Sequence, residues 1–428
     1  MRKTILFLLM SAVLMSLCAC NNPEQKENPE STIPTVFVRQ EDAAYTVSAP
    51  LQYPDYTFDH TPTTDELRQM AVKAMGDMIS VQWSVDRFFL YNKTSTGNQK
   101  DYSFIPQNTY CGMPYTNADG TIVQWFEFYD PETGRLQIEG DTQQINQLVG
   151  NTCAGCVCAA WTTVCDSIKG ACGTAEMVPY YGFIPVGPYE SNYSITSYSQ
   201  YPTDQILRDN GKPVMYESYA QILPADGLVS TPDVHAIMAI EPAYVVRDSD
   251  GEIDPDASYV VIRDQRAGGP DGFYNVEENE ETFYYSGRMR HEYTFTELYD
   301  LGYLPVTTAE FLGREPYAEA EVTFSVDSPT VATLGGGSFL SNYPICVAKM
   351  ILVDAQGNEE VVERVLLDKR DIASGVARNM PISQFITSVQ SKEFKEMLEN
   401  GKQYTLRYEI TVSNAQKFTP VEITVTGE

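Results

Sequence analysis

Apolar residues recur at intervals of three and four along residues 64–80, which is the pattern of a helix with one buried face. At the start of this segment, Thr63 and Glu66 have the spacing of a capping box, in which each side chain bonds the backbone N–H of the other residue. The pattern therefore predicts an amphipathic helix over residues 64–80 that begins after Thr63.

The middle of the chain combines helical, looped and strand-like patterns. Residues 145–161 indicate a loop that leads into a helix beginning near Cys153, and residues 295–301 indicate a short helix. Residues 173–215 are rich in Tyr, Pro and Gly and have no clear period, so they predict a long loop. Two apolar arms around a polar turn predict a β-hairpin over residues 234–265.

The pattern changes after Pro316, where strand-like runs separated by turn residues follow one another, with one helix over residues 391–399. The runs cover residues 319–326, 345–353, 361–367, 404–412 and 421–425. Short strands at this spacing predict an antiparallel β-sandwich over residues 317–428. Together with the mixed segments before Pro316, they predict an α+β protein.

The N-terminus has the features of an export signal. A positively charged start is followed by an apolar run over residues 4–17, which is too short to span a bilayer comfortably but is typical of a signal-peptide core. Leu17-Cys18-Ala19-Cys20 resembles the lipobox of bacterial lipoproteins, in which the closing cysteine is diacylated and becomes the new N-terminus. The resemblance implies a leader over residues 1–19 and lipidation of Cys20; an ordinary signal peptide cut nearby is the alternative.

The segment after the lipobox favours a tethered protein at the outer membrane. Asn21 follows Cys20, and by resemblance to the sorting rules of Gram-negative lipoproteins a residue other than Asp favours the outer membrane. Residues 22–35 are rich in Pro, Glu, Asn and Ser, which predicts a flexible tether within residues 20–61. We therefore expect a lipid-anchored protein that faces the periplasm or the outside.

The net charge limits the expected binding partners, and the chain length limits the expected number of domains. The formal net charge is -29, and removal of Arg2 and Lys3 with the leader takes it to -31. Nucleic acid is not an expected partner, because binding of phosphates needs a basic face. About 400 residues remain after processing, which is too many for one core and predicts two or three domains.

Seven cysteines remain besides those of the lipobox: Cys111, Cys153, Cys156, Cys158, Cys165, Cys172 and Cys346. An odd number leaves at least one thiol unpaired in an oxidising compartment. Five of them crowd into residues 153–172 without the paired C-x-x-C knuckles of zinc sites, so no metal and no other cofactor is expected. A structural account places Cys156 and Cys158 in the core and joins Cys165 to Cys172 by a disulfide.

The predicted helix start at Cys153 suits thiol chemistry. A helix N-terminus favours the thiolate, and the two small residues after Cys153 are expected to leave its sulfur accessible. A neighbouring imidazole is needed to complete an ion pair. His235 begins the hairpin arm, whereas His60 lies in a predicted linker and His291 in a charged stretch expected to be solvated. A structural role for His235 is the alternative.

Four segments follow one another in a characteristic order: Tyr110-Cys111-Gly112-Met113-Pro114-Tyr115, Cys153-Ala154-Gly155 followed by Val157 and Trp161, Leu223-Pro224-Ala225-Asp226-Gly227, and Val234-His235-Ala236-Ile237-Met238. They resemble segments of the NlpC-type papain-like cell-wall amidases, and the nearer likeness is to two-domain lipoprotein members from gut Bacteroidota. The resemblance implies a papain-like domain over residues 62–316, with Cys153 as nucleophile and His235 as its partner. It also implies that Tyr110 and Tyr115 contact the substrate.

The chain departs from the family beside the nucleophile, where Thr152 replaces the usual Asp and Ala154 the usual Ser. That neighbourhood contacts the peptide in the family, so the change bears on the substrate class. The third catalytic group is expected on the return strand, where Asp264 and Gln265 point to opposite faces. Asp264 resembles the acidic residue of related CHAP-type amidases and is favoured. Gln265 is the alternative and is also expected to contact the substrate; a bulge at Pro242 would change the parity.

These features predict an extracytoplasmic cysteine hydrolase that cleaves amide bonds in peptidoglycan stem peptides or other short peptides. The alternative is a non-catalytic surface lipoprotein that binds glycan or protein ligands on a decayed amidase fold, a role that the 28 tyrosines would suit. Reaction of Cys153 with iodoacetamide near neutral pH separates the two hypotheses.

Overall fold

The computed structural model describes residues 50–92, 101–116, 119–137, 149–168, 173–179, 182–191, 202–266, 274–278, 281–367, 371 and 374–427. The expected leader, Cys20 and most of the tether lie outside these residues. The described residues belong to one compact unit. None of the helices in this part of the chain is long and apolar enough to cross a membrane.

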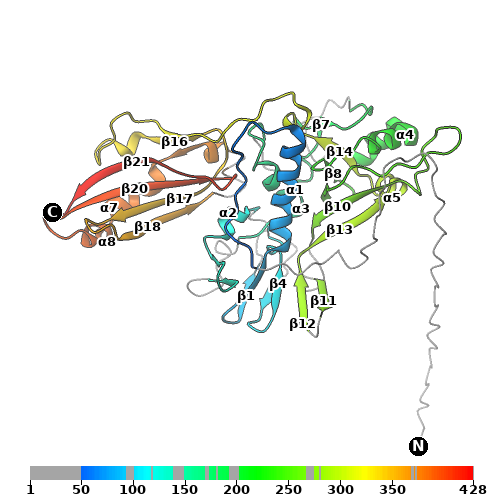
Figure 1. Cartoon of the computed structure of the whole chain (residues 1–428). Coiled ribbons are helices and arrows are strands. Elements are labelled where there is room, and N and C mark those ends of the chain that lie inside the picture. The colour runs from blue at the N-terminus through cyan, green and yellow to red at the C-terminus, as the bar shows by residue number, and fades with distance from the viewer. Residues whose placement is uncertain are drawn as a thin grey trace, which may run out of the picture. The chain divides into compact units, whose positions relative to one another are not determined.

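The protein is a mixed α+β structure with several sheets (Figure 1). The sheet that carries the candidate site has six strands, and each neighbouring pair in it is antiparallel. Its strands in spatial order are β13 (Gly287–Thr294), β10 (Tyr259–Gln265), β9 (His235–Ala239), β8 (Gly227–Ser230), β14 (Leu304–Thr307) and β7 (Ile184–Pro185). The predicted hairpin is confirmed as the antiparallel pair β9–β10, although its first strand ends at Ala239, before the expected Val246.

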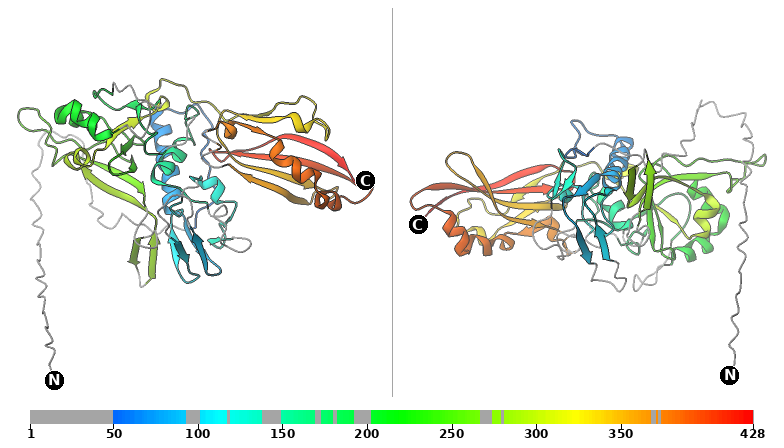
Figure 2. Two further views of the ribbon diagram at one scale, coloured as in Figure 1. Left: turned by 180° about the vertical axis from the view of Figure 1, so that it is seen from behind. Right: turned by 90° about the horizontal axis from the view of Figure 1, so that it is seen from below.

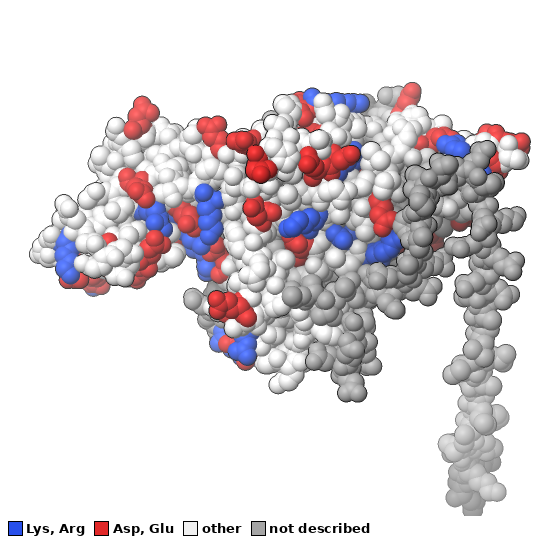
Figure 3. All heavy atoms as spheres, viewed as in Figure 1, with Lys and Arg blue, Asp and Glu red and all other residues white. Residues whose placement is uncertain are grey.

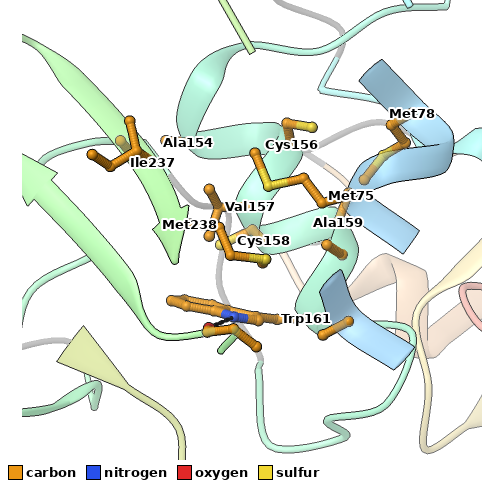
Figure 4. Packing of buried hydrophobic residues seen from close by; sticks show 14 of the residues in the cluster. Met75, Met78, Ala154, Cys156, Val157, Cys158, Ala159, Trp161, Ile237 and Met238 are labelled. Atoms are coloured by element: carbon orange, nitrogen blue, oxygen red, sulfur yellow. Dashed lines mark hydrogen bonds between the residues drawn. The ribbon is translucent and has the colours of Figure 1, made fainter. Parts of the chain in front are cut away.

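Helix α1 (Thr64–Ser80) has the predicted bounds. Thr63 Oγ1 accepts from the N–H of Glu66 at 3.3 Å, and Glu66 Oε2 accepts from the N–H of Thr63 at 2.7 Å, so the capping box is confirmed. The apolar face of α1 includes Met75 and Met78, which are fully buried and point towards helix α3 (Figure 4).

Helix α3 (Cys153–Trp161) packs against both α1 and β9 (Figure 4). All nine of its residues are buried, because the segment contains only small or apolar side chains. Val157 and Trp161 are fully buried, and burial of such side chains contributes about 1.5–3 kcal/mol each. The indole Nε1 of Trp161 donates to the carbonyl of Ala225 at 2.8 Å. These contacts fix the start of α3 beside strand β9.

A second six-stranded sheet combines parallel and antiparallel pairs. Its strands in spatial order are β11 (Tyr274–Glu278), β12 (Glu281–Tyr285), β4 (Thr109–Cys111), β1 (Gln82–Val85), β6 (Arg135–Leu136) and β5 (Tyr129–Asp130); β2 (Phe89–Asn92) and β3 (Asp101–Phe104) pair separately, and α2 (Ile122–Trp125) follows β4. Trp83 of β1 stacks on Tyr110 of β4 with ring centroids 4.6 Å apart. Both rings are buried, so they anchor this sheet to the core.

The strands after Pro316 form two antiparallel sheets, and the larger is seen from two directions in Figure 2. One sheet contains β15 (Val322–Phe324), β16 (Ser338–Ser341) and β19 (Asn379–Pro381); the other contains β18 (Glu359–Leu366), β17 (Ile345–Val353), β20 (Gln403–Val412) and β21 (Lys417–Thr426). Phe339 and Tyr408, one from each sheet, lie 5.7 Å apart in one buried cluster. The two sheets therefore share a core.

Short helices complete the structure. They are α5 (Phe295–Asp300), α7 (Ser383–Gln390), α8 (Lys392–Met397) and the 3-10 turns η4 (Glu310–Leu312), η5 (Leu334–Gly336) and η6 (Val376–Arg378). Helices α5 and α8 match predicted segments, whereas α7 was not predicted. Ser391 separates α7 from α8 and caps α8 by accepting from the N–H of Phe394 at 3.0 Å.

The prediction of a loop over residues 173–215 is wrong for its C-terminal part, which forms helix α4 (Thr203–Tyr219). Gly211 has a φ of +78° and breaks the helix into two pieces. Pro213 lies just after the break, where the first N–H groups of the second piece lack intrahelical partners in any case. A glycine and a proline so close together interrupted the helical period in the sequence.

Buried hydrogen bonds join the C-terminal sheets to the region before them. Gln124 Nε2 donates to the carbonyls of Cys346 at 3.0 Å and of Leu367 at 2.7 Å. Ser413 Oγ donates to the carbonyl of Thr162, just after α3. Cys346 also belongs to the same buried cluster as the residues of α3. The strands after Pro316 thus have their own sheets but share buried contacts with the rest of the unit.

Candidate active site

Cys153 is the first residue of helix α3, as predicted, and it is only 3% exposed. Thr152 caps the helix, because its Oγ1 accepts from the N–H of Gly155 at 3.1 Å. The expectation of an accessible sulfur is wrong, because Cys153 is buried. The hydroxyl of Tyr115 lies 3.6 Å from Sγ and the carbonyl of Val234 lies 3.9 Å from it, so both cover the thiol.

Asp119 places a carboxylate at the N-terminus of α3. Its Oδ1 accepts from the backbone N–H of Thr152 at 2.8 Å and from the Thr152 hydroxyl at 2.5 Å. A negative charge is stabilising at this end of a helix. The backbone N–H of Cys153 donates to the hydroxyl of Tyr115. Asp119 was not predicted, because a separate loop brings it beside Thr152.

His235 opens strand β9 and contacts Asp264 of the adjacent strand β10. Nε2 of His235 lies 3.0 Å from Oδ2 of Asp264, and the two side chains are 11% and 0% exposed. Since Nε2 is used in this way, Nδ1 is the ring nitrogen left for Cys153, with which His235 shares a hydrogen bond. The structure therefore brings together the three residues that the sequence selected as a triad.

Asp264 and Gln265 point to opposite faces of β10, as the sequence predicted. Gln265 Nε2 donates to the carbonyl of Met113 at 2.6 Å, inside the protein. Its amide therefore bonds Met113 and not His235, and because Gln265 is fully buried it has no surface to offer to a substrate. The register shift in this strand lies between Ile262 and Asp264, in the pairing with β13, and not at Pro242.

Asp264 also forms an ion pair with an arginine of the neighbouring strand β13. Arg288 of β13 is its Cα partner in the ladder. Nε of Arg288 donates to Oδ1 at 3.0 Å and Nη2 donates to Oδ2 at 2.7 Å, which is a bidentate ion pair. Arg266 Nε lies further from the carboxylate, at 3.8 Å from Oδ2. The sequence analysis missed Arg288, because only the strand pairing places it beside Asp264.

The electrostatics of this cluster favour a thiolate–imidazolium pair. Burial opposes ionisation of Cys153, but the hydrogen bond and the charge of His235 together lower its pKa below the ordinary value. Burial likewise opposes protonation of His235, but its hydrogen bonds to Asp264 and Cys153 raise its pKa to about 9. Asp264 remains ionised, because His235 and Arg288 outweigh the burial that raises its pKa and leave it well below the usual range. Such a pair is the resting form of an activated cysteine nucleophile.

A small pocket of about 160 Å³ opens beside His235 and is lined also by Tyr115, Asp233 and Arg266. The Tyr303 hydroxyl donates to Oδ2 of Asp233 at 2.9 Å and holds this carboxylate at the rim. Asp233 and Arg266 supply opposite charges, and the sequence analysis had selected neither. Tyr115, for which the resemblance implied a substrate contact, lies in this lining.

Tyr110 lies elsewhere and is only 2% exposed. It is part of the aromatic core beside Trp83, and its hydroxyl accepts from the N–H of Ile105 at 2.8 Å. The expected substrate contact through Tyr110 therefore does not correspond to its position, since a side chain buried in this way supports the sheet instead.

Val234 holds a strained backbone between the pocket and the thiol. Its φ is +51°, a region that β-branched residues rarely adopt, and its side chain is 70% exposed. Its carbonyl faces the sulfur of Cys153, and the next residue is His235. Strain of this kind persists only where the surrounding structure over-determines it, and it clusters at functional sites.

The other histidines lie outside this cluster. His60 is exposed and pairs with Asp59 and Glu66. His291 packs its ring 4.7 Å from that of Tyr293, and burial together with the charge of Arg288 lowers its pKa to about 4. The expectation of a solvated His291 is therefore wrong, because the charged stretch around it is a strand whose ladder partner is the buried β10.

The other cysteines of the described residues are all buried: Cys111, Cys156, Cys158, Cys165 and Cys346. Cys172 lies outside the described residues. Cys156 is a fully buried free thiol, and Cys165 is another, which rules out the predicted Cys165–Cys172 disulfide. Cys158 is disulfide-bonded, although the sequence account treated it as a simple core residue. Within the described residues no group of three or more His, Cys, Asp or Glu side chains could hold a metal ion.

No family model, no curated protein and no solved structure matches the chain.

Proposed function

We propose that this protein is an extracytoplasmic cysteine hydrolase that cleaves amide bonds in short peptides, with peptidoglycan stem peptides as the expected substrates. We further propose a papain-like, NlpC-type domain over residues 62–316. The observation that carries the proposal is the buried, connected set of Cys153, His235 and Asp264. A thiol at a helix start, an imidazole and an orienting carboxylate in this order are what nucleophilic cysteine catalysis requires.

The reaction follows from the roles of these groups. The Cys153 thiolate attacks the amide carbonyl carbon, and a new C–S bond forms. The C–N bond then breaks, and the imidazolium of His235 gives its proton to the leaving amine. The resulting thioester is attacked by water, from which neutral His235 takes a proton; the C–S bond then breaks, the carboxylic acid leaves and the thiolate–imidazolium pair is restored. Asp264 stays ionised and orients His235 throughout.

The start of helix α3 is suited to stabilise the charge that develops on the carbonyl oxygen. The N–H groups of Thr152 and Gly155 are engaged by Asp119 and by the Thr152 side chain. Those of Cys153 and Ala154 adjoin the nucleophile, and the N–H of Cys153 contacts the Tyr115 hydroxyl, which a substrate carbonyl oxygen would displace. Fixed N–H donors at this position supply the electrostatic part of catalysis.

The charged lining of the pocket is expected to make the site prefer polar peptides. Asp233 and Arg266 flank His235 and present one carboxylate and one guanidinium. Acidic and basic side chains are interspersed on the face shown in Figure 3. A short peptide with both signs of charge fits this lining better than an apolar ligand does.

The decisive experiment uses the full-length protein in detergent, incubated with muropeptides and analysed for new amine and carboxylate ends by mass spectrometry. Wild-type protein is expected to cleave, whereas Cys153→Ala and His235→Ala are expected to be inactive. Cys156→Ala is the matched control, because it removes a buried thiol from the same helix and leaves His235 in place. Full activity of Cys153→Ala would refute the mechanism. An inert Cys153 together with an absence of cleavage would favour the non-catalytic ligand-binding alternative.

The same proposal includes anchoring at the outer membrane through Cys20. Its support is the sequence: the apolar run of residues 4–17, the motif that ends at Cys20, and the polar segment of residues 22–35. An anchored enzyme of this kind would act on wall peptides or on peptides at the cell surface.

A further inference from the structure

We infer that Arg288 is a positioning residue of the proposed triad, which locks the Asp264 carboxylate in the orientation in which Oδ2 accepts from His235. The inference rests on the proposed cysteine chemistry and extends it by one residue. Arg288 does not reach the pocket lining, so it would act through Asp264 and not on the substrate.

The geometry is a row across three adjacent strands. His235 is on β9, Asp264 on β10 and Arg288 on β13, and these strands are neighbours in the sheet. Both oxygens of Asp264 are bonded by Arg288, at 3.0 Å and 2.7 Å, and Oδ2 also contacts His235 at 3.0 Å. With both oxygens held by a planar fork, the carboxylate cannot rotate about its terminal bond without losing two charge-assisted hydrogen bonds.

Arg288 is itself held in place. Its Nη2 donates to the hydroxyl of Tyr293 at 3.2 Å, and its guanidinium lies 5.7 Å from the centre of the same ring. The Arg288 side chain is 12% exposed and that of Asp264 is 0% exposed, so the ion pair is screened little by water. A buried carboxylate that lost this partner would keep a large desolvation penalty. The pair therefore couples the position of Asp264 to strand β13.

The positive charge of Arg288 also partly offsets the negative charge of Asp264. It therefore limits how far Asp264 raises the pKa of His235. The titratable or charged groups that face Asp264 are His235, Arg266, Arg288, His291, Cys156 and Tyr303. Removing one cation from this set makes every nearby proton harder to lose. In a plot of activity against pH, the acid limb, where Cys153 ionises, and the alkaline limb, where His235 loses its proton, should then both move to higher pH.

The test measures the rate at which iodoacetamide alkylates Cys153 in the full-length protein at each pH, read from the Cys153 peptide by mass spectrometry, together with kcat on muropeptides. In Arg288→Gln the midpoint of alkylation is expected to rise by roughly half to one pH unit, because a nearby cation is lost. In Arg288→Lys the charge remains but the fork is lost, so kcat should fall about tenfold or more with little change in the midpoint.

Arg290→Gln is the matched control, since Arg290 lies on the same strand with the same charge but pairs with Glu241 and Glu292. It should change neither the midpoint nor kcat. If Arg288→Gln does not fold, Arg288→Lys decides alone, and wild-type kcat in that variant would overturn the inference. An unchanged midpoint in folded Arg288→Gln would also overturn it. A slow, ordinary reaction of Cys153 in the wild-type protein would instead count against the proposed function.

Discussion

The side chains of Asp264 and Gln265 leave strand β10 on opposite sides, so that one meets His235 at 3.0 Å and the other meets the carbonyl of Met113 at 2.6 Å. The alternation of a strand makes these two neighbours exclusive choices for the third position of a triad. In this chain the carboxylate is on the side of the imidazole, and the amide is inside the protein.

We therefore expect opposite effects from the two substitutions. Asp264→Asn should lower kcat by about a hundredfold or more, because an amide can hold the wrong tautomer of His235. Gln265→Ala should leave kcat within a few-fold of wild type but lower the free energy of unfolding by about 1–3 kcal/mol, since the Met113 carbonyl loses a buried donor. Muropeptide kinetics and chemical denaturation of the same preparations separate the two effects. A large loss of kcat in folded Gln265→Ala would contradict this assignment.

The pH dependence of cleavage should be bell-shaped. The pKa of Cys153 is lowered, so activity should rise on the acid side below the ordinary titration range of a thiol as the thiolate forms. The pKa of His235 is raised to about 9, so activity should fall as the pH passes about 9 and the proton needed by the leaving amine is lost. In Asp264→Asn the alkaline limb should move down towards the ordinary histidine value, because the raising carboxylate has gone. The measurement is kcat against pH for both proteins, and an alkaline limb that stays in place would argue against the pairing.

The charged lining of the pocket should affect binding more than chemistry. Arg266→Gln is expected to raise KM about tenfold for peptides with a carboxylate near the scissile bond, and to change kcat little, because Arg266 is partly exposed and contacts no reacting atom. Asp233→Asn should do the same for peptides with an ammonium group. Arg208→Gln, an exposed arginine on α4, is the control. Equal KM values for charged and neutral peptides in wild type would exclude this role.

The close approach of Asp119 to helix α3 predicts a steric effect at Gly155. A methyl group added at Gly155 would lie within van der Waals overlap of the Asp119 carboxylate, which caps the helix through Thr152. Gly155→Ala should therefore lower the free energy of unfolding by about 1–3 kcal/mol and slow the alkylation of Cys153. Gly336→Ala is the control, because no atom lies near its added methyl. Thermal unfolding of the two variants measures the difference.

Lipidation can be tested independently of catalysis. Cys20→Ala should abolish incorporation of a labelled fatty acid and leave unprocessed precursor or release the protein from the membrane fraction. Cys18→Ala should retain the label, because the motif closes at Cys20. Loss of label from Cys18→Ala together with its retention in Cys20→Ala would move the lipidation site.

Local signals carried the parts of the fold and site that could be predicted. The capping box of α1 lies within four adjacent residues, and the predicted helix start at Cys153 is confirmed. Hairpin pairing, which is short-range, placed Asp264 and Gln265 on the return strand, and Asp264 was favoured over Gln265 by its resemblance to the acidic residue of CHAP-type amidases. Arg288 and Asp119 were missed, since their places depend on strand register and on a separate loop. Tyr110 was misplaced because a tyrosine can equally serve a core, and α4 was missed because Gly211 and Pro213 break its period.

The hydrogen bonds of the Gln124 side chain link the stability of the C-terminal sheets to that of the region before them. Its Nε2 bridges two carbonyls, those of Cys346 and Leu367, at the ends of neighbouring strands. Removal of the residues after Pro316 would leave the Nε2 group of Gln124 without these two acceptors. It would also expose the part of the buried cluster that Cys346 covers. Unfolding of the C-terminal sheets and of the helix that bears Cys153 should therefore be one cooperative event, with a single calorimetric transition for residues that belong to different sheets. The stability of the C-terminal strands would then determine the temperature up to which Cys153 keeps the folded surroundings that lower its pKa.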